Sequence, residues 1–248
     1  MNNDWSIYFV PATRAFLSGQ NPYTFVPGYA SPPWTLGLLA PLVWLPPLLA
    51  MALPLLALLY LSIRRRKPYL LALVGLSFPF IAGSVYANID WLVMLGVAIG
   101  GPLGVILDTV KPQAGVFAIL AEVSARKKTA SRLLLILPLC LLALVSIPLW
   151  SGWLHNIVSV GGHQDRSLSL FPYSLPLGIV ALYLAWRRKS PLWGCIASLS
   201  IAPYWYIHSL MPLLFLVADR NWRAGLALNA ASWLLVGLII SGIVPVQL

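Results

Sequence analysis

Few residues of this chain could do chemistry, because only 9% of its 248 residues are charged. Asp4 is the only acidic residue among the first 33, and a carboxylate of this kind can act as a general base. Arg14 and Arg166 are cations that could bind a negatively charged group, and His163 and His208 could hydrogen-bond a polar one. These side chains are far apart in the sequence, so chemistry requires a fold that brings them to one face.

Metal chemistry is not indicated by the spacing of these groups. The histidine and aspartate residues do not follow a metal-ligand pattern, so we expect no metal and no other cofactor. Cys140 and Cys195 both lie inside apolar runs and are interpreted as small core residues.

The elements that must position these groups are membrane helices. The chain is 60% hydrophobic with a mean hydropathy of +0.85, whereas a soluble domain carries about 25% charged residues. Apolar runs long enough to cross about 30 Å of hydrocarbon recur along the chain, which indicates an all-α polytopic membrane protein. The net charge of +10 does not indicate nucleic-acid binding, because the basic residues form short clusters between apolar runs.

We expect two regions, an extracytoplasmic amphipathic segment over residues 1–33 and a transmembrane helical domain over 34–248. Near 34–44 the prolines favour a re-entrant or interfacial helix, and 112–124 is expected to lie at the interface. Eight short spans are expected, near 46–63, 68–86, 90–107, 131–150, 171–186, 191–205, 206–219 and 225–245.

The basic clusters predict an orientation. If Arg64 to Lys67 face the cytoplasm, so does every other one of the 16 Lys and Arg residues except Arg14 and Arg166, Lys111 included. Both termini are then extracytoplasmic. The residues expected on the outer face are Asp4, Arg14, Asn88, Asp90, His155, His163, Asp165, Arg166 and His208.

Several short motifs occur in a fixed order along the chain. The first segment reads Asp4-x-x-x-Tyr8, then Gly19-x-Asn21-Pro22-Tyr23, then Tyr29-x-x-Pro32-Pro33. Later stretches read Ala87-Asn88-Ile89-Asp90-Trp91-Leu92, Lys111-Pro112-Gln113 and Ser200-Ile201-Ala202-Pro203-Tyr204-Trp205-Tyr206-Ile207-His208. In this order the motifs resemble the polyprenol-phosphate-mannose-dependent mannosyltransferases of the GT-C superfamily, although Ala87 and Asn88 replace the family's Gly and Gln.

The resemblance implies a GT-C-like fold and transfer of a hexose, such as mannose, from a polyprenyl-phosphate donor to an extracytoplasmic acceptor. Asp4 would be the catalytic base that removes a proton from the acceptor hydroxyl. The residues expected to bind substrate are Tyr8, Arg14, Asn21, Tyr23, Asn88, His163, Arg166 and His208. The expected partners are the lipid-linked donor, membrane lipids and subunits of a membrane complex, at the plasma membrane and without nucleic acid.

Structural interpretations of the same residues remain open. Asp4 and Asp90 could each cap a helix, and Asn21 belongs to a stretch with turn-forming composition. His208 could simply pack among aromatic residues, and Arg14 could extend towards lipid phosphate.

A non-enzymatic alternative also remains open. Family members carry a transmembrane helix before the Asp-bearing loop, whereas Met1 stands three residues before Asp4. We therefore expect either a recorded start inside a longer protein or a shortened relative. The second case would suit a structural or accessory subunit of a larger membrane complex.

Overall fold

The computed structural model of the chain describes residues 3–161 and 167–242, and these ranges contain helices and no strand. Four elements are not α-helices: η1 is a π-helix, and η2, η3 and η5 are 3₁₀-helices. The elements in chain order are η1 (Trp5–Phe9), α1 (Val10–Leu17), α2 (Pro22–Phe25), α3 (Pro33–Leu39), η2 (Ala40–Leu42), α4 (Pro47–Arg65), α5 (Tyr69–Leu73), α6 (Phe78–Val85), α7 (Asp90–Ile99), α8 (Gly101–Asp108), α9 (Pro112–Gly115), α10 (Ala118–Ala125), α11 (Thr129–Val145), η3 (Ile147–Leu149), α12 (Trp150–Gly161), α13 (Leu175–Arg188), α14 (Pro191–Ile201), η5 (Ile207–Leu210), α15 (Met211–Arg220) and α16 (Trp222–Ile240).

Proline sets many of the helix starts. Pro33, Pro47, Pro112 and Pro191 each occupy the first position of a helix, where the missing N–H group costs nothing. The helix expected at 46–63 is confirmed as α4, which begins at Pro47 and ends in the basic residues Arg64 and Arg65. The cations suit the negative end of the helix dipole.

Two helices are long and apolar enough to cross a membrane by length and composition, α4 and α16, with 19 residues each. A third candidate span is the pair formed by Thr129–Val145 and Ile147–Ser159, which is bent by 57° at its break. Nineteen residues rise about 28 Å, which is close to the hydrocarbon thickness. The helical membrane class is therefore supported by two or three spans, and the remaining expected crossings stay a prediction.

The single helix expected at 90–107 is wrong, because the chain folds back between α7 and α8. Gly100 and Gly101 have φ values of +62° and +72°, which glycine adopts without strain. A Cβ atom on Gly96 would lie 2.9 Å from the carbonyl oxygen of Gly104. In a straight helix these residues would be about 12 Å apart along the axis.

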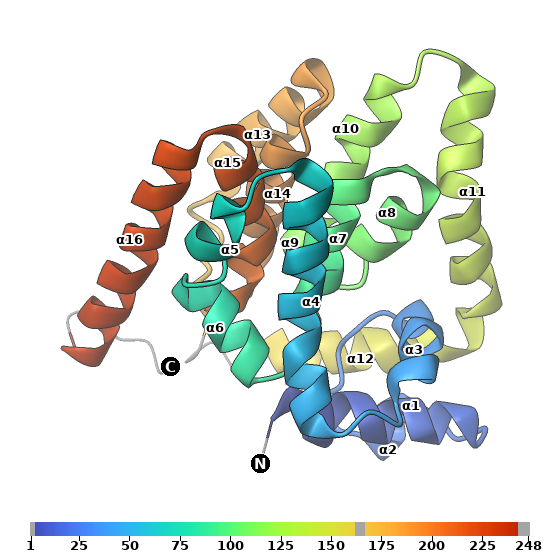
Figure 1. Ribbon diagram of the computed structural model, residues 1–248. Coiled ribbons are helices and arrows are strands. Elements are labelled where there is room, and N and C mark those ends of the chain that lie inside the picture. Colours follow the sequence, from blue (N-terminus) through green and yellow to red (C-terminus); the bar gives the residue numbers. More distant parts are fainter. Residues whose placement is uncertain (1–2, 162–166, 243–248) are drawn as a thin grey trace.

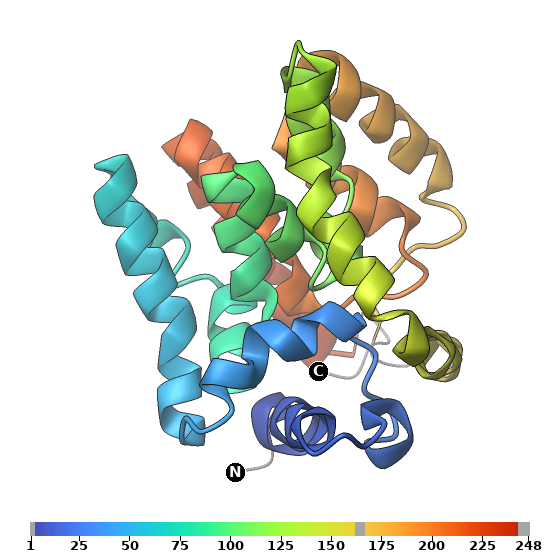
Figure 2. The ribbon, with the colours of Figure 1, turned by 90° about the vertical axis from the view of Figure 1, so that its right-hand side faces the viewer.

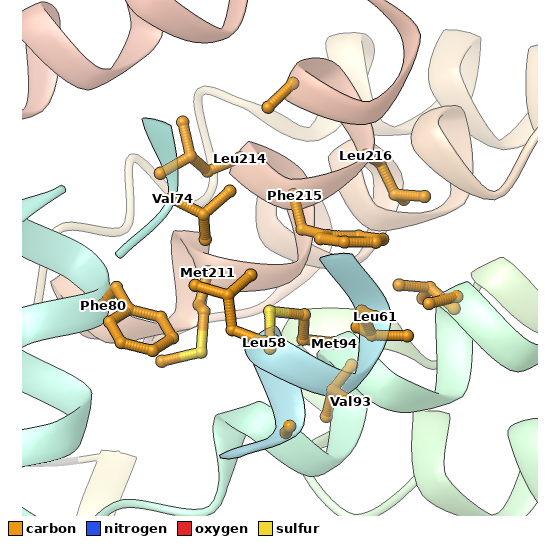
Figure 3. Close-up of a cluster of buried hydrophobic side chains, with 14 of the residues drawn as sticks. Leu58, Leu61, Val74, Phe80, Val93, Met94, Met211, Leu214, Phe215 and Leu216 are labelled. Carbon is orange, nitrogen blue, oxygen red and sulfur yellow. The ribbon is translucent and has the colours of Figure 1, made fainter. Parts of the chain in front are cut away.

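The main hydrophobic cluster lies where α4, α7 and α15 meet. Figure 3 shows Leu58 and Leu61 of α4 beside Met94 of α7 and Met211 and Phe215 of α15, and all five side chains are fully buried. For helices in a bilayer, close packing of such side chains drives association, because lipid tails are as apolar as leucine. The cluster therefore holds α4, α7 and α15 together.

A second cluster binds the N-terminal segment to the helical domain. Trp5, Phe9 and Tyr29 are buried together with Ile89 and Leu92, which lie at the start of α7. The N-terminal segment is consequently packed against the helical domain.

The connections α4–α5, α10–α11, α13–α14 and α15–α16 lie at one end of the molecule, and α1, α2 and α12 lie across the other (Figures 1 and 2). These connections carry the basic clusters of the sequence. At that end Lys67 Nζ donates to Asp219 Oδ1 over 2.9 Å, and Arg65 Nε lies 3.7 Å from Asp219 Oδ2. The cytoplasmic placement of this end remains a prediction.

The close approach of α14 to α10 at Gly194 gives a test of the packing. A Cβ atom on Gly194 would overlap the backbone of Ala118, whereas one on Gly237 of α16 would enter open space. We expect Gly194→Ala to destabilise the protein by about 1–3 kcal/mol. Gly237→Ala is the matched control and should leave the melting temperature in detergent unchanged or slightly higher. Equal melting temperatures for the two variants would contradict this packing.

Candidate functional site

The turn between α6 and α7 places Asn88 at the centre of a polar cluster. Ala87 has a φ of +48°, in the left-handed region that favours glycine, and Asn88 follows it with its side chain buried. Asn88 Oδ1 accepts a hydrogen bond from the backbone N–H of Ile89 over 2.7 Å. Asn88 Nδ2 donates to Asp4 Oδ2 over 2.5 Å. Asp4 is thereby hydrogen-bonded to the turn that precedes α7.

His208 extends this cluster to a second aspartate. Its Nδ1 lies 2.8 Å from Oδ2 of Asp90, and because an ionised carboxylate only accepts, Nδ1 carries the proton. Its Nε2 atom lies 3.5 Å from Asn88 Nδ2. The two N–H groups of the Asn88 amide therefore point to Asp4 and to His208.

Neither aspartate acts as a helix cap through its side chain. Asp4 occupies the N-cap position of η1 but makes no side-chain capping bond, and Asp90 is the first residue of α7, after Ile89. The capping interpretations are therefore wrong for both residues. Asp90 is completely buried, and its partners are His208 and Lys111.

Lys111 belongs to the same cluster. Its Nζ lies 3.9 Å from Asp90 Oδ2, and its side chain is 12% exposed. The expectation that Lys111 lies in a cytoplasmic loop, at the end opposite Asp4, is wrong. The physical reason is the fold-back at Gly100 and Gly101, since α8 returns the chain towards Asp4 and does not complete a crossing.

These polar groups border a cavity of about 760 Å³. This volume is within the range of about 300–1,000 Å³ that is typical of ligand sites. Its polar wall includes Asp4, Asn88, Lys111, Gln113 and His208. The other lining residues are Tyr8, Phe9, Pro27, Gly28, Tyr29, Ala30, Ser31, Phe78, Ala82, Tyr86, Val110, Pro112, Ser159, Leu168, Tyr204, Tyr206, Ile207 and Ile239.

The loop over residues 26–31 forms one rim of the cavity and is held by α12. Asn156 Nδ2 donates to the carbonyl oxygens of Tyr23 and Tyr29 over 3.1 and 3.0 Å. Trp153 Nε1 donates to Ala30 O over 2.9 Å. No sequence motif singled out Asn156. An asparagine in an otherwise apolar, aromatic helix is the signal that could have found it.

Tyr23 also holds this loop in place. Its hydroxyl donates to Ser31 O over 2.8 Å, and its ring lies 5.5 Å from that of Tyr29. Burial raises the pKa of both tyrosines, so both phenols are neutral at physiological pH. Tyr23 does not line the cavity, whereas Tyr8 and Tyr29 do. Of the three, Tyr23 is therefore a structural residue in this loop.

Two other residues expected to bind substrate lie outside the cavity lining. The Arg14 guanidinium is 5.3 Å from the ring centroid of Trp44. Asn21 Oδ1 accepts from the N–H of Tyr23 over 3.0 Å and caps α2, as its turn-forming context favours. The cavity thus joins Asp4, Tyr8, Asn88 and His208 of the expected set, and it adds Lys111, Gln113 and the supporting residue Asp90.

The remaining expected residues, His163 and Arg166, lie outside the described residues, together with Asp165. Among the described residues, no group of three or more His, Cys, Asp or Glu side chains could hold a metal ion.

No family model, no curated protein and no solved structure matches this chain. The function must therefore be argued from the cavity and its residues.

The two hydrogen bonds of the Asn156 amide are expected to hold the loop over residues 26–31 in place. Asn156→Ala leaves two carbonyl oxygens without their donors, which should cost about 1–3 kcal/mol of stability. His155→Ala changes an exposed neighbour on the same helix and should have little effect. Limited proteolysis within residues 24–31 should accelerate in the Asn156 variant alone. Cleavage at the same rate in both variants would show that α12 does not hold the loop.

Proposed function

We propose that this chain is a membrane glycosyltransferase that moves a hexose, such as mannose, from a polyprenyl-phosphate donor to an extracytoplasmic acceptor. The observation that carries the proposal is the juxtaposition of Asp4, Asn88 and His208 on one cavity wall. These residues come from three of the motifs that resemble the GT-C mannosyltransferases. They are 84 and 120 positions apart in the sequence.

Asp4 is the group that we propose as the catalytic base. Asn88 donates to Asp4 Oδ2, the side chain is only partly buried, and it lines the cavity. The acceptor hydroxyl loses its proton to this carboxylate while its oxygen forms a bond to the anomeric carbon. The bond between that carbon and the phosphate oxygen breaks, and the phosphate leaves with the electron pair. Asp4 takes up the proton, so the step requires no other base.

His208 is a second group that we propose to contact the sugar or its acceptor. Because Nδ1 is paired with Asp90, Nε2 is the ring nitrogen on the Asn88 side of the cavity. There it can form a hydrogen bond with a substrate hydroxyl. Tyr8, on the same wall as Asp4, can hydrogen-bond another.

The amphipathic lining supports a lipid-linked substrate. The lining contains the polar side chains named above and also the apolar residues Phe78, Ala82, Leu168, Ile207 and Ile239, contributed partly by α6 and α16. Because α16 is one of the two helices that could cross a membrane, part of this apolar lining comes from a helix that would face lipid. A sugar joined to a long hydrocarbon by phosphate has the matching distribution of polarity.

Asp4→Asn tests the base directly. The variant can still accept a hydrogen bond from Asn88 but cannot take a proton, so donor consumption should fall about 100-fold or more. The measurement is release of polyprenyl phosphate from polyprenyl-phosphate mannose in proteoliposomes supplied with an envelope glycan extract. Glu122→Gln is the control, because this carboxylate lies in α10 and outside the cavity lining. Turnover at the wild-type rate by a folded Asp4→Asn protein would refute this mechanism.

His208→Gln should lower turnover in the same assay by about 100-fold, since the imidazole that lines the cavity is lost. His155→Gln changes an exposed histidine of α12 and serves as the matched control. An equal rate for both variants would remove His208 from the proposed site. A folded wild-type protein without any turnover would favour the accessory-subunit alternative.

A further inference from the structure

Lys111 is the only Lys or Arg among the described residues that line the cavity. Arg14 is stacked near Trp44 and lies outside the lining. The Nδ1 atom of His208 is paired with the Asp90 carboxylate. Among the described residues, Lys111 is therefore the cavity-lining cation with the weaker internal partner, and it is the group that would attract a ligand with negative charge.

The partner of Lys111 does not satisfy it fully. The 3.9 Å between its Nζ and Asp90 Oδ2 exceeds hydrogen-bond distance, and the same oxygen accepts the shorter bond from His208 over 2.8 Å. An ammonium group has three N–H donors. The Lys111–Asp90 contact is thus a long ion pair in a largely buried place, where a charge-assisted hydrogen bond to an anion would be stronger.

The neighbourhood of Lys111 suits an anion joined to an apolar chain. Gln113, two residues further on, also lines the cavity and adds amide donors. The apolar residues Phe78, Ala82 and Ile239 line the same cavity. A free anion would interact only with the donors of Lys111 and Gln113, whereas an anionic lipid would also contact the apolar lining residues.

We propose that Lys111 forms the subsite for the phosphate group of a polyprenyl phosphate, and that Asp90 is the internal counter-ion which the phosphate displaces from Lys111. As the donor subsite of an enzyme this inference rests on the proposed function, but binding can be measured without turnover. Asp90 keeps Lys111 paired in the empty cavity and repels an entering phosphate. The pair thereby limits how tightly the phosphate is held, which favours release of the lipid phosphate after transfer.

Substitutions of Lys111 and of Asp90 are consequently expected to change the affinity for polyprenyl phosphate in opposite directions. Lys111→Met removes the cation and should weaken binding of polyprenyl phosphate by at least about tenfold, since the charge-assisted hydrogen bond to the phosphate is lost. Asp90→Asn removes the repelling charge and frees Lys111, so it should tighten binding by several-fold. If the ion pair served stability alone, both variants would lower the melting temperature and neither would change affinity in this pattern.

The experiment is equilibrium binding of decaprenyl phosphate to the full chain in maltoside micelles, measured by thermophoresis together with the melting temperature of each variant. Lys127→Met is the matched control, because Lys127 is exposed in the α10–α11 connection and remote from the cavity lining. Inorganic phosphate and a polyprenol without phosphate are the two other ligands. We expect tight binding of the polyprenyl phosphate alone, with the two signs given above.

Three results would overturn the inference. One is unchanged affinity of the Lys111→Met protein with its melting temperature preserved. Another is equally tight binding of inorganic phosphate, which would assign the subsite to free anions. A third is weaker binding in Asp90→Asn without loss of stability, which would make Asp90 part of the binding site.

Failure of this inference can be distinguished from failure of the proposed function. Donor turnover with an unchanged KM in the Lys111→Met protein would leave the glycosyltransferase in place and remove the subsite. Conversely, binding of polyprenyl phosphate that depends on Lys111 in a chain without turnover would keep the subsite and refute the enzyme.

Discussion

The amide of Asn88 joins three segments that are distant in the sequence. One of its N–H groups is used by Asp4 of the N-terminal segment, the other points to His208 at η5, and its oxygen accepts from the backbone at the start of α7. Since the side chain is buried, an unused donor or acceptor would cost about 1–3 kcal/mol. The polar wall of the cavity depends on this one residue finding all its partners.

The charges behind that wall obey a related constraint. A completely buried carboxylate such as Asp90 is costly unless it is paired, and it pairs with both His208 and Lys111. The apolar packing of α4, α7 and α15 in Figure 3 holds the start of α7 in place. The pairing of Asp90 with His208 and Lys111 and the apolar packing around α7 therefore stabilise the same arrangement of helices.

Four residues that the sequence singled out lie together in the structure. Asp4, Tyr8, Asn88 and His208 all line one cavity, and their part in substrate binding stays a prediction. Arg14 and Asn21 were expected with them but make local contacts, a stacked ring and a helix cap. A motif records which residues occur in order, and it does not distinguish a residue that lines a cavity from one that shapes the loop beside it.

By itself the sequence determined the properties that depend on neighbouring residues: the helical class, the proline-defined helix starts, the apolar length of α4 and α16, and the basic clusters between helices. Only the tertiary structure decided where Lys111 lies and what Asp90 does. Both depend on the reversal at Gly100 and Gly101, which is maintained by the close approach of Gly96 to Gly104. Hydropathy along a chain does not record such a reversal, because two short apolar helices packed together have the same composition as one long helix that crosses a membrane.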